Sequence, residues 1–237
     1  MEGGKRVFPC ELSLFMGILL VSFAVCLFVR SGYGVTVLAS VPLLLSYIFP
    51  VMDFGTWNIV YQFVLLCIAI AITRRPNMGY AISMLEGILF GIFLNIMKTL
   101  LADIPISFEL SLLYLFVAHI LLFLGVSFFM RAYIPLLPCD LFIRDVVITC
   151  RISYRKFKTI FDVTCMVTSA AMGILAFGHL VDIGIGTVIS ACITGYFVSR
   201  ITVQIYDRYF EFRPATKFCR RYLSDDAPCK AEGPREG

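Results

Sequence analysis

Charged residues are scarce in this sequence of 237 residues: Asp, Glu, Lys and Arg together make up only 15% of it. Hydrophobic residues make up 59%, and the mean hydropathy is +0.89. Soluble globular domains are about 45–50% apolar and about 25% charged, so this composition excludes an ordinary soluble domain. Because the few charges cluster between long uncharged runs, the sequence predicts an all-α protein that crosses a membrane several times.

Side chains that commonly build metal sites and active sites are also few. The sequence has only two His residues, His119 and His179, and its nine Cys residues include no C-x-x-C pair. Most of these Cys residues lie in apolar runs, where thiols behave as small hydrophobic side chains. No Ser/His/Asp arrangement, phosphate-binding Gly-Lys loop or glycosidase-like carboxylate pair is recognisable. We therefore expect no enzymatic activity, no metal site and no cofactor.

Six apolar runs are long enough to cross the hydrocarbon core, which takes about 20 residues as a helix. They cover residues 12–29, 57–73, 78–97, 108–130, 160–177 and 183–199. A further uncharged run, 34–49, is shorter and contains Pro42. We interpret it as a short re-entrant helix packed against protein. If 34–49 were instead a seventh span, every later segment would change sides of the membrane.

The basic residues are distributed unequally between the two sides that six spans define. Of the 20 Lys and Arg residues, all except Arg30 and Lys98 fall on the same side as the N-terminus. Lys and Arg mark cytoplasmic loops, so the sequence predicts an inner-membrane protein with both termini in the cytoplasm. Segment 134–150 lies on this side, and we expect it to form an interfacial helix with an Asp140–Arg144 pair.

The two halves of the sequence resemble each other. The first half contains "LLVSFAVCLFVR" (19–30), "FGTWNIV" (54–60) and "MGYAISMLEG" (78–87). In the same order, the second half contains "LFLGVSFFMR" (122–131), "FKTIFDV" (157–163) and "IGTVISACITG" (185–195). A unit of three spans inserts its second copy in the opposite sense, so the sequence predicts an inverted-topology repeat, which is common in secondary transporters. The predicted organisation is a cytoplasmic tail (1–11), a first repeat (12–100), an outer linker (101–107), a second repeat (108–200) and a basic cytoplasmic tail (201–237).

Stretches of both halves resemble a known family. The segment "FDVTCMVTSAAMGILAFGHLVDIGIGTVISACITGYFV" (161–198) is similar to the last two spans of the YczE-like and YitT-like bacterial membrane proteins. "FGTW" (54–57) and "RRPNMGYAISMLEG" (74–87) resemble the first half of the same family, and "GIGTVISA" (184–191) is the most specific element. The resemblance implies an integral membrane protein of five or six spans without an established reaction. The sequence departs from the expected pattern at Glu86 and Gly87.

One acid, Glu86, lies in the middle of the apolar run 78–97. A charged carboxylate at the centre of a bilayer costs roughly 2.5–3.5 kcal/mol on insertion scales, so burial favours its protonated form. A protonatable acid at this depth is typical of proton coupling, and Ser83 lies one turn earlier as a hydrogen-bonding neighbour. The alternative is a neutral Glu with a purely structural hydrogen bond.

Small residues at four-residue spacing lie beside Glu86. Two notches are predicted: Ser83, Gly87, Gly91 and Asn95 in the third run, and Ala191 and Gly195 in the last. Residues four apart share a helix face, and small side chains let a second backbone approach closely. We expect the two notches to cross each other, either as tight structural packing or as a sliding contact. An exposed Gly87/Gly91 face would instead support a homodimer.

Further polar residues lie within the apolar runs or at their ends. They are Asn58, Asn95, His119, Asp162, Ser190 and Thr194, and with Ser83 and Glu86 they form the predicted substrate or proton pathway. An imidazole midway along a span, such as His119, can relay protons or bond a backbone carbonyl of a neighbouring helix. Asp162 follows a basic cluster at 155–158 and is expected to form a surface ion pair, with a gate contact as the alternative.

The predicted function is secondary transport of a small, unidentified solute, with proton coupling through Glu86. The alternative is a non-transporting accessory or sensor protein that binds a partner through the basic tail. That tail mixes Arg with Tyr and Phe in "RITVQIYDRYFEFRPATKFCRRYL" (200–223). This composition favours contact with membrane lipid over nucleic acid.

Overall fold

The computed structural model describes residues 6–74, 78–132, 137–201 and 210–213. The eight helices are α1 (Cys10–Ser31), α2 (Val37–Ile48), α3 (Phe54–Thr73), α4 (Met78–Leu100), α5 (Phe108–Ala132), α6 (Pro138–Cys150), α7 (Tyr154–Phe177) and α8 (Ile185–Ile201). Two short strands, β1 (Arg6–Pro9) and β2 (Phe210–Arg213), complete the described elements. The prediction of an all-α membrane architecture is therefore confirmed for the part of the chain that is described.

Five of these helices are long and apolar enough to cross a membrane: α1, α3, α4, α5 and α7. The sixth predicted span corresponds to α8, which has 17 residues, or about 26 Å at 1.5 Å per residue. The short apolar helix α2 has 12 residues, or about 18 Å, well below the roughly 30 Å of a hydrocarbon core. The helix that the run 34–49 forms is therefore too short to be a seventh span, which agrees with the short helix predicted from the sequence. The chain is built as a multi-pass membrane protein.

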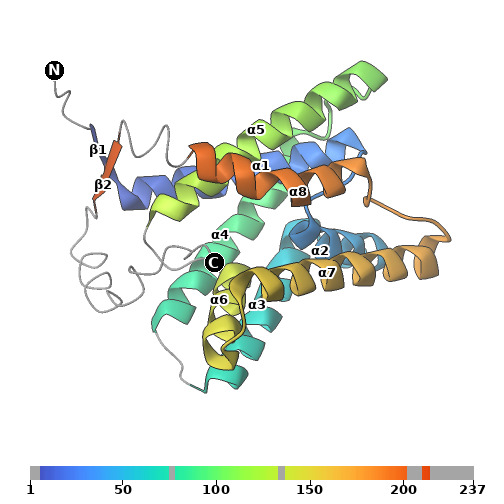
Figure 1. Ribbon diagram of the computed structural model, residues 1–237. Coiled ribbons are helices and arrows are strands. Elements are labelled where there is room, and N and C mark those ends of the chain that lie inside the picture. Colours follow the sequence, from blue (N-terminus) through green and yellow to red (C-terminus); the bar gives the residue numbers. More distant parts are fainter. Residues whose placement is uncertain (1–5, 75–77, 133–136, 202–209, 214–237) are drawn as a thin grey trace.

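The helices form two layers that α4 connects (Figure 1). Helices α1, α5 and α8 make up one layer, and α2, α3, α6 and α7 make up the other, while α4 packs against both α1 and α3. Helices α1 and α5 are antiparallel: Ser13 Oγ near the start of α1 donates to the Phe128 carbonyl (2.9 Å), and the Phe28 ring near its end contacts the His119 ring. The central core lies between these two helices and α4.

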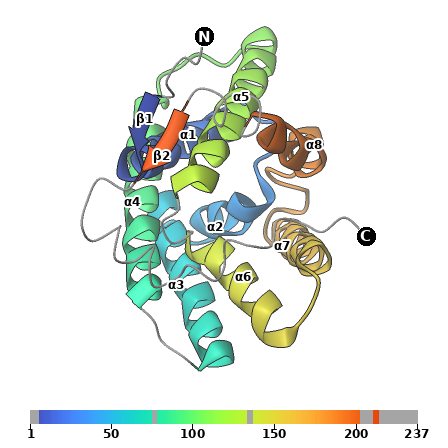
Figure 2. The ribbon, with the colours of Figure 1, turned by 60° about the vertical axis from the view of Figure 1, so that its left-hand side comes forward.

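The two short helices lie at the centre of the molecule, between α3 and α7 (Figure 2). In α2, Leu43 and Leu44 are fully buried, as expected for a short helix packed against protein. In α6, Leu141 and Ile143 are also buried, so one face of this helix packs into the protein, whereas Ile148 near its end is exposed. Its position at the membrane interface stays a prediction. The expected Asp140–Arg144 pair is wrong, because Arg144 pairs with Asp145, its neighbour in sequence, at 3.1 Å.

The described part of the basic tail pairs with the start of the chain. Strands β1 and β2 are parallel, with Arg6 opposite Phe210 and Pro9 opposite Arg213. The two segments therefore lie side by side at the same end of the molecule (Figure 1). The other residues predicted to form the cytoplasmic tail, 202–209 and 214–237, lie outside the described part of the chain.

Candidate functional site

The buried acid predicted in the middle of α4 is present and enclosed. Glu86 is only 2% exposed, and both of its carboxyl oxygens lack a hydrogen-bond partner among the described residues. A charged group in such surroundings is unfavourable unless it is paired and hydrogen-bonded. Glu86 therefore needs either a proton or a bound partner.

Two amide side chains of α3 extend this polar region. Asn58 and Gln62 are both 4% exposed, and Gln62 Nε2 donates to Asn58 Oδ1 one turn earlier. Gln62 Oε1 has no partner within the described structure. This oxygen lies against α4, since a Cβ placed on Gly87 would be 2.9 Å from it. Asn58, Gln62, Ser83 and Glu86 are the buried polar residues of α3 and α4, two helices that pack against each other, and we name them together the Glu86 site.

The chemistry of the Glu86 site depends on whether the acid carries a proton. An ionised carboxylate only accepts hydrogen bonds, whereas a protonated one can also donate. The site already holds an acceptor without a partner, Gln62 Oε1. A protonated Glu86, which can donate, therefore suits the site better than an ionised Glu86, which would add a second unpaired acceptor. Helix α6 encloses the site from another direction, because Pro138 Cγ lies 3.1 Å from the Cβ position of Gly87.

The small residues of α4 pack this helix on α3. A Cβ placed on Gly91 would lie 2.6 Å from the Gly55 carbonyl oxygen and 2.4 Å from Ile59 Cγ1. The expected crossing with the last predicted span is therefore wrong for Gly87 and Gly91, because their closest neighbours come from α3 and α6. Both glycines are buried, so this face is also not exposed for a homodimer.

Asn95 has a structural role at the end of this small-residue face. Its Oδ1 accepts a hydrogen bond from the Gly55 backbone N–H at 2.7 Å. Gly55 lies in the first turn of α3, where Asp53 makes no side-chain capping bond. Asn95 thus accepts a hydrogen bond from a backbone N–H in the first turn of α3, which would otherwise lack a partner. This is the task of a capping residue, performed here by a side chain from a neighbouring helix.

The second predicted notch does not form a matching contact. Ala191 is exposed on α8, and the surroundings of Gly195 lie outside the described structure. The notch is therefore not placed against α4 by any described contact.

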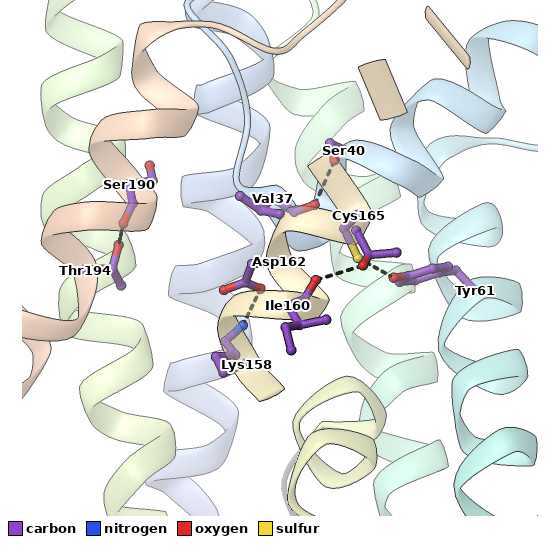
Figure 3. A network of polar contacts seen from close by, with 10 residues as sticks. Val37, Ser40, Tyr61, Lys158, Ile160, Asp162, Cys165, Ser190 and Thr194 are labelled. Atoms are coloured by element: carbon purple, nitrogen blue, oxygen red, sulfur yellow. Dashed lines mark hydrogen bonds and ion pairs between the residues drawn. The ribbon is translucent and has the colours of Figure 1, made fainter. Parts of the chain in front are cut away.

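His119 and Ser190 form a separate polar contact between α5 and α8. His119 Nδ1 lies 2.8 Å from the Leu115 carbonyl oxygen, and Nε2 lies 3.2 Å from Ser190 Oγ. A carbonyl only accepts, so Nδ1 carries the hydrogen and Nε2 can accept the Ser190 hydroxyl proton. Both ring nitrogens therefore have a hydrogen-bond partner. Thr194 Oγ1 donates in turn to the Ser190 carbonyl, and Figure 3 shows this pair on α8, apart from the polar residues of α7.

Asp162 forms the predicted ion pair near the start of α7. Lys158 Nζ lies 2.7 Å from Asp162 Oδ1 at a spacing of four residues. One turn further, Tyr61 of α3 contacts Cys165 Sγ at 3.3 Å, as Figure 3 shows. Asp140 of α6 lies close to this pair; burial raises the pKa of its carboxyl, and the Lys158 charge opposes the shift. These contacts join α3, α6 and α7.

The structure brings only part of the predicted pathway together. Asn58, Ser83 and Glu86 are buried residues of α3 and α4, which pack against each other, whereas His119 and Ser190 form a separate contact and Asp162 another. Sequence reasoning missed Gln62, although its spacing of four residues from Asn58 in an apolar run was a usable signal.

A family model described as a family of unknown function (DUF6198) matches residues 10–203. This match covers all eight helices, and it does not confirm the resemblance to the YczE-like and YitT-like proteins. No curated protein and no solved structure matches the chain.

Proposed function

The chain belongs to a family of unknown function, DUF6198, and from its own geometry we propose that it is a secondary transporter of a small solute in which Glu86 carries the coupling proton. The observation that carries this proposal is the buried Glu86 carboxyl with no hydrogen-bond partner in the described structure. A purely structural acid would have a partner, because unsatisfied buried polar groups are costly. Ionisable residues inside membrane spans are typically functional.

The proposed coupling follows from the two forms of the acid. When protonated, Glu86 is neutral and can donate to an acceptor such as the Gln62 amide oxygen. When it loses the proton, the charge requires either water or a bound solute group. Release of the proton therefore favours a conformation in which the Glu86 site opens, which is how proton movement becomes linked to a change of access.

We propose six spans arranged as two inverted repeats, with α1–α4 equivalent to α5–α8. The packing pattern supports this arrangement, because most contacts occur in equivalent pairs: α1–α4 with α5–α8, α2–α3 with α6–α7, and α2–α7 with α3–α6. Helices α1 and α5, the first of each repeat, pack against each other in opposite directions. An inverted repeat requires this antiparallel pairing.

The pairing of β1 with β2 supports a sixth crossing. Because residues 6–9 and 210–213 lie side by side, the chain between them crosses the membrane an even number of times. Five spans alone would leave these segments on opposite sides, so we propose α8 as the sixth. The charge distribution then favours an inner-membrane location with both termini in the cytoplasm.

A second candidate is a non-transporting accessory or sensor protein. It is supported by the enclosure of Glu86 and by a cavity at one end of α1 and α4 that reaches neither Glu86 nor His119. In this case the basic tail binds the partner, and the acid serves stability alone.

Proteoliposomes that contain the purified full-length protein and the trapped pH dye pyranine separate the two candidates. A panel of small solutes is added under an imposed pH gradient. We expect at least one solute to move protons, and Glu86→Gln to abolish this movement while solute binding remains. Glu109→Gln, which changes the acid in the first turn of α5, is the matched control. Unchanged proton movement in Glu86→Gln would refute the coupling role, and no transport of any solute would favour the accessory protein.

A further inference from the structure

A cavity separate from the Glu86 site lies where α1 and α4 end and α3 begins. It has a volume of about 170 Å³ and is lined by Cys26, Val29, Arg30, Phe54, Lys98, Leu101 and Ala102. This volume is far above the roughly 10–15 Å³ that holds one water molecule. Two lining residues are cations and none is acidic, so the cavity has a positive charge at an apolar wall.

The Arg30 guanidinium is held in place by backbone groups. Nη2 donates to the Ala102 carbonyl at 2.7 Å and to the Ile104 carbonyl at 2.5 Å, and Nε donates to the Ile104 carbonyl at 3.2 Å. These carbonyls fix the orientation of the side chain without neutralising its charge. A fixed guanidinium is well suited to recognise an oxyanion, because little side-chain freedom is lost on binding.

No carboxylate neutralises the two cations. Within the described ranges, neither Arg30 nor Lys98 takes part in an ion pair. Asp53 and Asp103 are the acids nearest in sequence to the lining residues, and both are exposed. Arg30 and Lys98 are also the only basic residues that the six-span arrangement places on the predicted outer side. Two uncompensated cations in one concave region attract an anion.

The remaining lining residues define the rest of the ligand. Val29, Phe54 and Leu101 offer apolar contacts beside the charged groups. Ligand sites commonly combine such an apolar wall with a few polar groups that fix the orientation of the ligand. A fully hydrated inorganic ion would leave this wall unused, whereas a molecule with an anionic head and a small apolar body would fill both parts.

We propose that this cavity binds the oxyanion group of a small, partly apolar molecule. Applied to the transported solute, the inference rests on the proposed transport function and makes that solute an organic anion. The same chemistry is offered by a free organic acid and by the headgroup of an anionic phospholipid. Binding itself does not require transport, so it is tested separately from Glu86.

The sole Trp residue provides a direct readout of binding. Trp57 lies in the first turn of α3, three residues after the lining residue Phe54, and its Nε1 donates to the Phe49 carbonyl. Its fluorescence is followed while the full-length protein in detergent is titrated with sodium butyrate or sodium phosphate, with sodium chloride as the reference. A parallel titration compares nanodiscs of phosphatidylcholine with nanodiscs that also contain phosphatidylglycerol.

We expect a saturable signal that depends on Lys98. Lys98→Gln should raise the Kd roughly tenfold or more, because a hydrogen bond to a charged group is lost, while Lys98→Arg should retain binding. Lys98 is exposed and makes no described ion pair, so the fold should survive, which thermal unfolding checks. Lys156→Gln, which removes an exposed cation from α7, is the matched control and should bind as the wild type.

Each outcome decides the proposal. Lys98-dependent binding of butyrate or phosphate identifies a free anion as the ligand, and a Lys98-dependent signal only with phosphatidylglycerol identifies a lipid headgroup. Both results support the oxyanion site. No saturable signal with any probe, or equal affinity in the wild type and Lys98→Gln, would overturn it. Neither of those results would bear on proton movement through Glu86.

Discussion

In the proposed inverted repeat, helices α3 and α4 of the first half correspond to α7 and α8 of the second, yet the two pairs differ in their packing. Helix α4 lies tightly on α3 through Gly55 and Gly91, and Asn95 of α4 bonds the first turn of α3. In the described residues, α7 packs mainly on α2 and makes no comparable interface with α8. Helix α7 also has the smallest buried share of the five span-length helices.

The difference has a cause in the sequence. Among the glycines whose surroundings the structure describes, none makes an equivalent crossing between α7 and α8; the glycine of α7, Gly173, faces the loop at His179 and Val181 with ordinary spacing. Small residues at a crossing allow two helix backbones to approach closely. The buried acid Glu86 thus lies on the tightly packed pair of helices, α3 and α4.

The largest effect is expected from breaking the tight pair. Gly91→Ala places a methyl group 2.6 Å from the Gly55 carbonyl oxygen and 2.4 Å from Ile59 Cγ1, so the two backbones must separate. Overpacking of this kind costs about 1–3 kcal/mol, and thermal unfolding in detergent should show a clearly lower Tm. Gly173→Ala is the matched control, because its methyl group would be 3.4 Å or more from its neighbours. Equal Tm values for the two variants would contradict the difference between the halves.

A smaller effect is expected from removing the capping bond of the tight pair. Asn95→Ala leaves the Gly55 N–H without its acceptor, and loss of a capping side chain costs about 0.5–2 kcal/mol. Thr99→Ala removes a hydroxyl that bonds only within α4, to the Asn95 carbonyl, and should change the Tm less. If Thr99→Ala were as destabilising as Asn95→Ala, the contact between α3 and α4 would not depend on this cap.

The sequence predicted the helices well because hydropathy and length determine them. All six predicted spans overlap observed helices, and the short helix at 34–49 is present as α2. The partner of Gly91 could not be predicted, because a small-residue face indicates a close approach without identifying the approaching helix. The internal repeat suggested α8, whereas the close approach is made by α3, the preceding helix in the chain.

The site was predicted only in part for a similar reason. Glu86 was visible as a single acid in an apolar run, but its lack of a partner depends on side-chain packing that the sequence does not show. His119 and Glu86 both lie midway along an apolar run, so their positions in the sequence did not show that His119 has hydrogen-bond partners on both ring nitrogens whereas the Glu86 carboxyl has none in the described structure. Contacts between distant segments, such as Tyr80 O–H donating to the Asp145 carboxylate, were not predictable from spacing.

The contact between α5 and α8 offers a third test, with a smaller expected effect. Ser190→Ala removes the hydroxyl next to His119 Nε2, and hydrogen bonds between membrane helices contribute only about 0.6 kcal/mol on average. The Tm should fall slightly, while Thr168→Ala, a change at an exposed position of α7, should leave it unchanged. A loss as large as that of Gly91→Ala would show that the second half depends on this bond as strongly as the first depends on its glycines.

The smallest effect on stability is expected from a comparison of the two central helices, α2 and α6. Helix α2 carries no charged residue, whereas α6 carries Asp140, whose protonation can make the Tm depend on pH. Burial raises the pKa of this carboxyl above its ordinary value, with the Lys158 charge opposing the shift. The folded protein therefore holds a proton that the unfolded chain has already lost, and stability falls as the pH rises from the ordinary Asp value through the raised one. Asp140→Asn should flatten the fall of the Tm as the pH rises above the ordinary Asp value of about 3.9, and Asp103→Asn, in an exposed loop, should not. An unchanged slope in Asp140→Asn would mean that α6 is hydrated at this position and lies in a different environment from α2.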